Sequence, residues 1–134
     1  MDRQVSYRGR FAPSPTGPLH FGSLIAALGS HADARSHDGV WLIRMEDLDR
    51  PREVSGSAAL IIETLARFGM VSDDAIVRQS SRTDAYRDAL IRLREAGRTY
   101  PCGCSRREVA AAGETGPEGP VYPGTCRGGL PAGR

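Results

Sequence analysis

The sequence predicts an α/β fold with a parallel sheet, and three features of its 134 residues indicate this fold. Residues 5–12 have the composition of a short strand. Residues 13–18 contain three prolines and a glycine, which end the strand in a stiff loop. A helical pattern follows, and then a continuous apolar run at residues 40–43. Strand, loop, helix and strand in this order form a βαβ unit.

The first predicted helix begins near Phe21 and ends before Gly39. Its expected buried face has the spacing i, i+3, i+4 and i+7 and consists of Leu24, Ala27, Leu28 and His31. The run at residues 40–43 is Val-Trp-Leu-Ile, rich in β-branched and aromatic side chains. Such a run is typical of a strand buried on both faces, as in a parallel sheet.

Two further helices are predicted before the composition changes. The first ends at Gly69, and its apolar face is formed by Ile61, Leu65 and Phe68. The second ends at Gly97, is expected to be capped by Ser81 with Asp84, and has an apolar face formed by Tyr86, Ala89, Leu90 and Leu93. Residues 113–134 are rich in glycine and proline, so we expect a loop-like or metal-organised segment there.

Composition narrows the class of protein. A hydrophobic fraction of 40% allows a core without disulfides. The formal net charge of +2 neither implies nor excludes an RNA partner. The three cysteines do not form a disulfide framework, which favours a reducing cytoplasm or a metal site. The N-terminal residues do not read as a signal peptide and no apolar run is long enough for a bilayer, so we expect a cytoplasmic protein without a membrane partner.

The segment from Pro13 to Ser23 has the properties of a phosphate-binding turn. It places a rigid loop and the sequence His20-Phe-Gly-Ser23 at the start of a helix, where free N–H groups and the helix dipole favour phosphate. Gly22 permits close approach of a nucleotide, and His20 can donate hydrogen bonds to phosphate oxygens. A histidine before a helix is more often only a cap, so the surrounding motif has to support the hypothesis.

Two motifs carry a resemblance to a known family. Residues 10–17, Arg-Phe-Ala-Pro-Ser-Pro-Thr-Gly, and then residues 19–23 resemble the first signature of the class I glutamyl-tRNA synthetase-like family. Residues 44–50, Arg-Met-Glu-Asp-Leu-Asp-Arg, resemble its second conserved block. The first signature is often written His-Ile-Gly-His, whereas this chain has Phe21 and Ser23, and Ser23 keeps a hydroxyl that can bond a phosphate.

A glutamate pocket needs a cation for the carboxylates and an acid for the ammonium. Arg10 and Glu46 both lie near the carboxyl ends of predicted strands, where ligands bind in open α/β sheets. From the residues alone, a solvated ion-pair cluster is the better explanation for the charged residues at 44–50. The resemblance implies that the glutamate-binding positions are Arg10, Phe11, Ala12, Pro13, Ser14 and Glu46.

Three cysteines, Cys102, Cys104 and Cys126, are good zinc ligands, and a structural zinc requires a fourth group. Chemistry alone ranks a carboxylate such as Glu108 or Glu114 above a tyrosine. The resemblance is closest to the glutamyl-Q tRNA(Asp) synthetases, whose Cys-x-Cys and Tyr-x3-Cys pattern implies Tyr122 as the fourth ligand. Three free thiols remain the alternative, although a metal would explain how this glycine-rich segment folds.

The resemblance implies the first half of a class I synthetase Rossmann-type nucleotide-binding fold in residues 1–100 and a zinc-binding subdomain in 101–134. It implies activation of L-glutamate with ATP and Mg²⁺, transfer to queuosine in the anticodon of tRNA(Asp), a structural Zn²⁺ and a monomer. The family's lysine-rich ATP loop has no counterpart, because all 18 basic residues are arginines. We therefore expect an incomplete catalyst. The alternatives are an ordinary glutamyl-tRNA synthetase fragment and a non-catalytic zinc and nucleotide-binding fragment.

Overall fold

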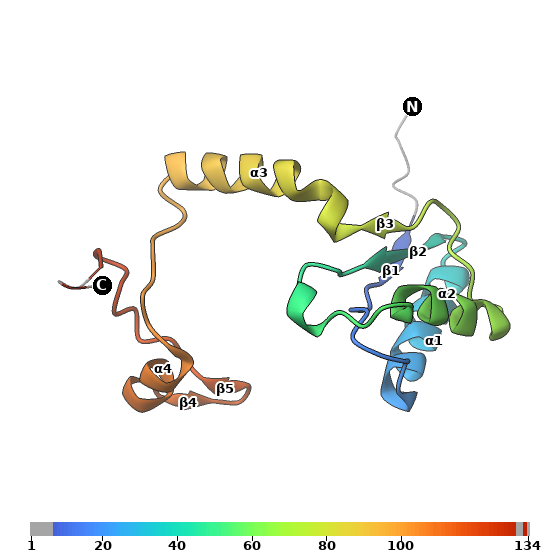
Figure 1. Ribbon diagram of the computed structural model, residues 1–134, viewed down its shortest axis with the longest axis horizontal. Helices are drawn as coiled ribbons and strands as arrows, with labels where there is room; N and C mark the ends of the chain where they lie inside the picture. Colours follow the sequence, from blue (N-terminus) through green and yellow to red (C-terminus); the bar gives the residue numbers. More distant parts are fainter. Residues whose placement is uncertain (1–6, 131–132, 134) are drawn as a thin grey trace. The chain divides into compact units, whose positions relative to one another are not determined.

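The structure is a computed structural model that describes residues 7–130 and 133. Its contacts divide the chain into two compact units, Met1–Thr83 and Asp84–Arg134. Within the described residues, the first unit holds a three-stranded sheet with two α-helices, and the second holds α-helices and a short hairpin (Figure 1). The division into a nucleotide fold at 1–100 and a zinc subdomain at 101–134 stays a prediction.

The sheet of the first unit is parallel throughout, in the order β1-β2-β3. Its strands are β1 (Arg8–Phe11), β2 (Val40–Met45) and β3 (Val77–Arg78). Helix α1 (Phe21–Ser36) connects β1 to β2, which confirms the predicted βαβ unit. The first strand is shorter than the predicted residues 5–12, and residues 5 and 6 lie outside the described residues.

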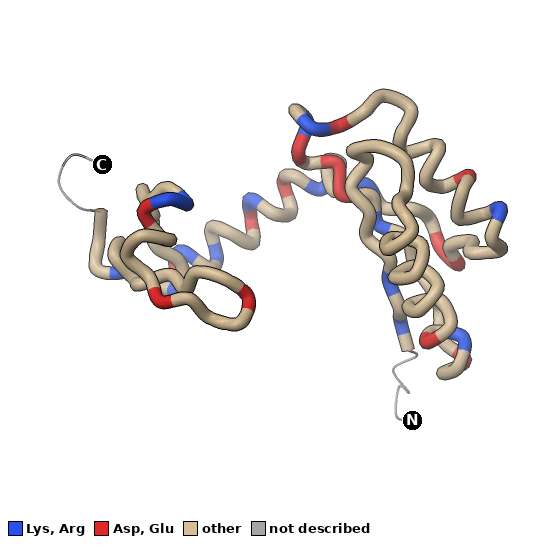
Figure 2. The backbone as a smooth tube through the Cα atoms, turned by 90° about the horizontal axis from the view of Figure 1, so that it is seen from below, with Lys and Arg blue, Asp and Glu red and all other residues tan. Residues whose placement is uncertain are grey.

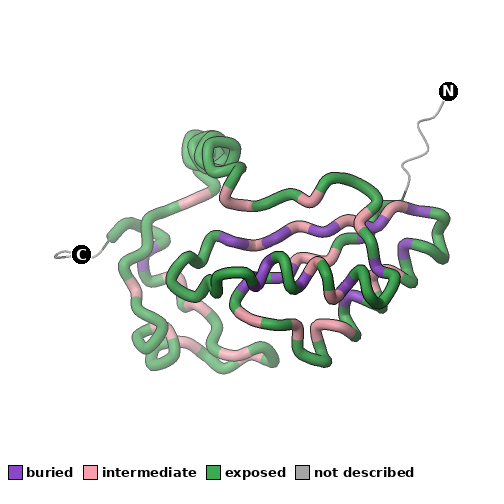
Figure 3. Tube along the Cα trace, turned by 45° about the vertical axis from the view of Figure 1, so that its right-hand side comes forward, coloured by how far each residue is buried: buried purple, intermediate pink, exposed green. Residues whose placement is uncertain are grey.

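A single cluster of apolar side chains forms the core under the sheet. Its buried members come from α1, β2, α2 (Ser57–Arg67) and the turn after α2: Ala27, Ala34, Trp41, Ile43, Met45, Ala58, Ile61, Leu65 and Met70. Buried residues alternate with half-buried ones along β2 (Figure 3). The expectation that β2 is buried on both faces is therefore wrong, because α1 and α2 both contribute to the cluster on the same face.

Helix α1 packs on the sheet through small residues. Ala27 and Ala34 are fully buried, whereas Leu28 of the predicted face is 58% exposed. The close contact explains this correction, because a Cβ on Gly9 of β1 would lie only 3.0 Å from the Cβ of Ala34. Leucine is too large for such a short separation, so alanines occupy the contact.

Helix α2 buries Ile61 and Leu65 as predicted, but Phe68 is 66% exposed. The reason for this difference is that the helix ends at Arg67, so Phe68 is already its C-terminal cap. Gly69 follows with φ of +76°, the left-handed conformation that terminates many helices. The predicted glycine stop is therefore confirmed.

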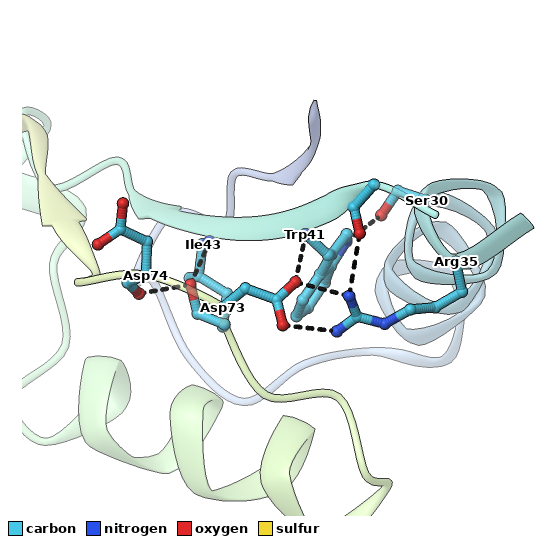
Figure 4. A network of polar contacts seen from close by, with 8 residues as sticks. Ser30, Arg35, Trp41, Ile43, Asp73 and Asp74 are labelled. Atoms are coloured by element: carbon cyan, nitrogen blue, oxygen red, sulfur yellow. Dashed lines mark hydrogen bonds and ion pairs between the residues drawn. The ribbon is translucent and has the colours of Figure 1, made fainter. Parts of the chain in front are cut away.

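A network of polar contacts joins α1, β2 and the segment before β3 (Figure 4). Asp73 accepts two hydrogen bonds from Arg35, at 2.7 and 2.9 Å, and one from the backbone N–H of Trp41 at 2.6 Å. The N–H of Ile43 donates to the hydroxyl of Ser72 at 3.2 Å. Side chains thus satisfy the edge of β2 where β3 has not yet begun. Arg35 and the Trp41 N–H together lower the pKa of Asp73 to about 2.

The second unit is built from short elements with little burial. They are α3 (Thr83–Glu95), α4 (Arg106–Ala112), β4 (Thr115–Gly116) and β5 (Gly119–Pro120). Helix α3 has no buried residue, and the predicted face of Tyr86, Leu90 and Leu93 is 37–56% exposed. Acidic and basic side chains are interspersed along α3 (Figure 2).

The ends of α3 match the prediction only in part. Gly97 follows the helix with φ of +65°, as expected for a stop. The Ser81 hydroxyl, however, donates to the carbonyl of Arg78, so it does not cap the helix. Two 3-10 turns, η1 (Arg50–Arg52) and η2 (Gln79–Arg82), complete the described elements. No described helix is both long enough and apolar enough to cross a bilayer.

Candidate active site and metal centre

The proline-rich loop after β1 is anchored to the start of α2. The side chain of Pro15 is fully buried, and its carbonyl accepts from the N–H of Val54 at 2.9 Å. Ser57 donates to the carbonyl of Gly17 at 2.6 Å and accepts from the Gly17 N–H at 3.0 Å. Gly17 has φ of +146°, which favours glycine. The loop is therefore held by specific bonds at two successive points.

His20 is the N-terminal cap of α1. Its Nδ1 accepts from the N–H of Ser23 at 3.2 Å, and its Nε2 lies 3.0 Å from the Ser23 hydroxyl. A Cβ on Gly22 would lie 3.1 Å from Cε1 of His20, so glycine leaves room for the ring. Ser23, expected to bond a phosphate, contacts His20 in this structure. The helix cap observed here and the predicted phosphate site thus involve the same two side chains, His20 and Ser23.

A cavity of about 440 Å³ opens between this loop and the first turns of α1. Most of its lining residues belong to the predicted turn at residues 13–23, and the full set is Phe11, Ala12, Pro13, Ser14, Thr16, Gly17, Pro18, Leu19, His20, Gly22, Ser23, Ala26 and Ile61. The first turn of α1 contains no acidic residue. A helix N-terminus without a carboxylate beside a cavity is suited to an anion such as phosphate.

Arg10 and Glu46 do not line this cavity. Arg10 pairs with Leu42 in the sheet and alternates with the buried Gly9, so it lies on the face opposite the core. Glu46 follows β2 and continues the alternation on the same open face as Arg10. The structure therefore places the two charged residues on one face of the sheet, outside the cavity that the loop residues line.

Asp47, next to Glu46, points into the protein and is 5% exposed. Its carboxylate accepts from the N–H of Ser80 at 2.9 Å and from the Ser80 hydroxyl at 2.7 Å, with Arg78 at 3.5 Å. Burial acts to raise the pKa of Asp47, but these hydrogen bonds outweigh it and lower the pKa. The predicted solvated cluster is thus only partly correct, because Asp47 is a buried anchor for η2.

The three cysteine sulfurs of the second unit converge, all within 4.8 Å of one another. Cys104 Sγ lies 3.6 Å from Cys126 Sγ, and Cys102 Sγ lies 3.4 Å from the Tyr122 hydroxyl. Around a tetrahedral zinc with Zn–S bonds of about 2.3 Å, two sulfurs lie roughly 3.8 Å apart and a sulfur and an oxygen roughly 3.5 Å apart. The donor set therefore fits a tetrahedral metal site.

Hydrogen bonds around the cluster favour the ionised form of one cysteine, Cys126. The backbone N–H of Gly103 and the Tyr122 hydroxyl lower the pKa of Cys126 to about 7. The Tyr122 oxygen accepts the Cys126 N–H at 2.9 Å, but the neighbouring Cys102 thiol raises the pKa of the phenol. A bound cation would reverse that effect by stabilising the phenolate.

The acidic alternative at Glu108 is engaged elsewhere. Its carboxylate accepts from the N–H and hydroxyl of Ser105, at 2.7 and 2.8 Å, in a capping box that starts α4. The Ser-x-x-Glu spacing that predicts such a box is visible in the sequence, although α4 was not predicted.

Comparison with known proteins decides the family. The family described as tRNA synthetases class I (E and Q), catalytic domain, matches residues 6–123. The chain belongs to this family. Its parallel βαβ sheet is the corresponding part of a class I synthetase catalytic domain.

Curated class I synthetases resemble the chain over most of its length. Glutamyl-Q tRNA(Asp) synthetase of Dechloromonas aromatica is 59% identical over 96% of the chain, which spans 43% of that relative. The protein of the same name from Aromatoleum aromaticum is 57% identical over 99% of the chain and 42% of the relative. A solved glutamate-tRNA synthetase from Elizabethkingia anophelis matches with a TM-score of 0.68 and 37% identity, over 77% of this chain and 22% of that one. The chain thus spans less than half the length of these synthetases.

Several residues that position the site in this synthetase chain were not predicted. Ser57 holds the loop, Asp47 and Ser80 join the end of β2 to η2, and Asp73 holds the edge of β2. Their partners lie 32–40 residues away in sequence, so no local pattern indicates them. The acidic residue at position 47 was noted only as part of an exposed cluster.

Proposed function

We propose that this chain supplies the phosphate-binding and glutamate-binding half of an enzyme that activates L-glutamate with ATP, of the glutamyl-Q tRNA(Asp) synthetase type. The observation that carries the proposal is the cavity at the start of α1, lined by His20, Gly22 and Ser23. The relatives with the highest identity quoted above bear that name.

In the proposed first step, a carboxylate oxygen of glutamate attacks the α-phosphorus of ATP. A new oxygen–phosphorus bond forms, the bond to the β-phosphate bridge breaks, and pyrophosphate leaves with Mg²⁺. His20, the backbone at Gly22 and the hydroxyl of Ser23 bind phosphate oxygens at the α1 N-terminus. Positioning and charge stabilisation supply the catalysis, and no protein nucleophile is required.

Glutamate recognition is assigned to the segment from Arg10 to Ser14 and to Glu46. Arg10 forms a charge-assisted contact with a carboxylate, and Glu46 accepts the ammonium group. Support comes from the open face of the sheet, on which both side chains lie. Phe11, Ala12, Pro13 and Ser14 lead from that face into the cavity.

A structural Zn²⁺ is proposed at Cys102, Cys104, Tyr122 and Cys126. The sulfur–sulfur and sulfur–oxygen separations support four ligands in a tetrahedron. Such a site has no open position, so the ion stabilises the glycine-rich segment and takes no part in the chemistry.

In the proposed second step, the activated glutamate is transferred to queuosine in the anticodon region of tRNA(Asp), with a cytoplasmic monomer as the working form. The names of the relatives and the cysteine–tyrosine pattern favour this acceptor. The second candidate is an ordinary glutamyl-tRNA synthetase, which the 37% identity to a glutamate-tRNA synthetase favours. Activation without tRNA distinguishes the two, because the ordinary enzyme of the resembled family requires tRNA for that step.

The decisive experiment replaces the matching segment of the Dechloromonas aromatica relative with this chain. Glutamate-dependent exchange between ATP and pyrophosphate is then measured without tRNA, beside the unmodified relative and the 134-residue chain alone. We expect exchange by the chimera and little by the chain alone. A folded, zinc-loaded chimera that is silent while the relative is active would contradict the proposal.

A matched pair of variants in the chimera links the activity to the cavity. His20→Ala removes a side chain from the cavity lining, whereas His31→Ala removes one that packs edge-on against Trp41 outside it. The first substitution should raise the KM for ATP and lower kcat, and the second should affect stability only. Equal losses in kcat/KM for both variants would mean that the cavity is not the phosphate-binding site.

A further inference from the structure

Arg44 is the nearest charged neighbour of Glu46 on the open face of β2. Its Nη2 forms an ion pair with Oε1 of Glu46, and the two side chains are 27% and 32% exposed. Residues two apart on a strand point to the same face, so this contact follows from the strand itself. We propose that Arg44, given the proposed glutamate activation, is a positioning residue that orients the Glu46 carboxylate to accept the substrate's ammonium group.

The contacts of Glu46 leave one acceptor available. Oε1 is engaged by Arg44, and the backbone N–H of Glu46 donates to the carbonyl of Pro13 at 2.9 Å. Within the part of the chain that the structure describes, Oε2 has no hydrogen-bond or ion-pair partner. An ionised carboxylate accepts through both oxygens. Arg44 therefore fixes the group by one oxygen while the other is free for an ammonium N–H.

In this geometry one atom of the Arg44 side chain has no hydrogen-bond partner among the described residues. This atom is Nε, and it is buried. Leaving a buried N–H without a partner is unfavourable, and such groups are rare in folded proteins. The conformation thus fits a residue whose task is to hold Glu46.

Charge on the open face supports the same role. Arg8 and Arg10 have no side-chain partner among the described residues, whereas Arg44 is neutralised by Glu46. An unpaired Arg44 would repel the ammonium group of an amino acid that reaches Glu46. The pairing removes that repulsion and leaves Arg10 as the open cation for a carboxylate. A zwitterionic ligand then meets the open cation of Arg10 at its carboxylate end and the unengaged Oε2 of Glu46 at its ammonium end.

The first test measures Glu46 in the chain without ligand. Side-chain NMR of the γ-methylene protons and carboxyl carbon is compared between wild type, Arg44→Gln and the matched control Arg8→Gln, which changes an unpaired arginine on the same face. We expect one ordered Glu46 rotamer in wild type and Arg8→Gln, and rotamer averaging in Arg44→Gln. An equally ordered Glu46 in a folded Arg44→Gln chain would overturn the proposal.

The second test compares two ligands by NMR titration of the chain: L-glutamate, and glutarate, which lacks the ammonium group. Arg44→Gln should weaken L-glutamate roughly tenfold, because an unoriented Glu46 no longer makes a well-placed charged hydrogen bond to the ammonium group, and should leave glutarate unchanged. Arg44→Lys should recover part of the loss, because it keeps the charge without the planar fork. Equal weakening of both ligands would refute positioning and indicate direct contact or a damaged fold.

Failure of the proposed function has a different signature. If wild type binds neither ligand while the Glu46 rotamer still depends on Arg44, the glutamate assignment fails and the orienting contact stands. If L-glutamate binds to wild type and Arg44→Gln equally, the assignment stands and the proposed role of Arg44 is wrong. Thermal melts of all three variants check that each chain is folded.

Discussion

Each of the two units of this chain is stabilised internally by a different kind of interaction. The first unit packs a cluster of buried apolar side chains under a parallel sheet and ties its loops with hydrogen bonds between distant residues. In the second unit, helices α3 and α4 contain no buried residue. Among the described residues of this unit, Cys126 is the one whose side chain is fully buried. A hydrophobic core specifies the first fold, whereas three thiols and a phenol converge within the second.

Metal removal should give the largest difference between the two units. If zinc organises residues 102–126, a chelator should abolish the dispersed amide signals of this segment, because metal binding in such small domains supplies about 10–16 kcal/mol of folding free energy. Amides of the first unit should keep their protection from hydrogen exchange. Persistence of α4 and the β4–β5 hairpin in metal-free protein would show that the converging thiols are not a folding device.

The identity of the fourth ligand is tested by a pair of tyrosine substitutions. Tyr122→Phe removes the hydroxyl beside Cys102, whereas Tyr100→Phe removes one from the ring stacked on Tyr122 at 6.4 Å. Only the first should weaken zinc binding, by more than the roughly 10–100-fold typical of groups that merely support a ligand. Similar zinc affinity in both variants would leave Tyr122 outside the metal site.

The core of the first unit should be sensitive at Leu65. This side chain is fully buried, and Leu65→Ala should lower the free energy of unfolding by about 2–5 kcal/mol. Leu60→Ala in the same helix changes a side chain that is 46% exposed and should lower it by less than about 1 kcal/mol. Chemical denaturation followed by Trp41 fluorescence provides the measurement. Zinc affinity should not change, and a parallel loss would mean that the units depend on one another.

Local patterns in the sequence were sufficient for the βαβ order and for the glycine that ends α2. They placed the strand at residues 40–43 because a short run of large apolar residues between a glycine and a charged residue is compatible with few structures other than a strand. They misplaced the face of α1, since the close approach of Gly9 and Ala34 depends on packing and not on hydrophobicity. The two-residue strand β3 has no periodicity to detect, and it forms because β2 offers an edge.

The candidate sites themselves stay predictions, and the structure shows only where their residues lie. Cysteine spacing indicated a metal site, and the first signature led to the residues that line the cavity at α1. Hydrogen bonds between distant residues were missed, among them Ser57 to Gly17 and Ser80 to Asp47. Serine and aspartate are common in loops, and only the fold shows which of them meet.

A smaller effect is expected at Asp73, which should make the first unit sensitive to acid. A carboxyl whose pKa is lowered from 3.8 to about 2 in the fold contributes stability above its unfolded pKa, and that contribution is lost as the pH falls through this interval. Asp73→Asn should therefore lower Tm near neutral pH, and its Tm should converge on that of wild type as the pH falls below 2. Asp74→Asn changes the next residue in the chain, which has no ion pair with any other described residue, and should show no such convergence. A difference that is constant with pH would exclude the carboxylate charge as its cause.

The smallest effect should come from Ser57, whose hydroxyl joins α2 to the proline-rich loop. Ser57→Ala removes both contacts to Gly17 and should lower the free energy of unfolding by about 1 kcal/mol, while Ser55→Ala, an exposed residue two positions earlier, should change it little. Because Pro15 is still buried and still bonded to Val54, only the part of the loop beyond it should loosen. Hydrogen exchange should then quicken at the Gly17 amide and not at the Val54 amide. Equal acceleration at both would mean that the loop opens as one piece, and that the buried proline does not hold it without the serine.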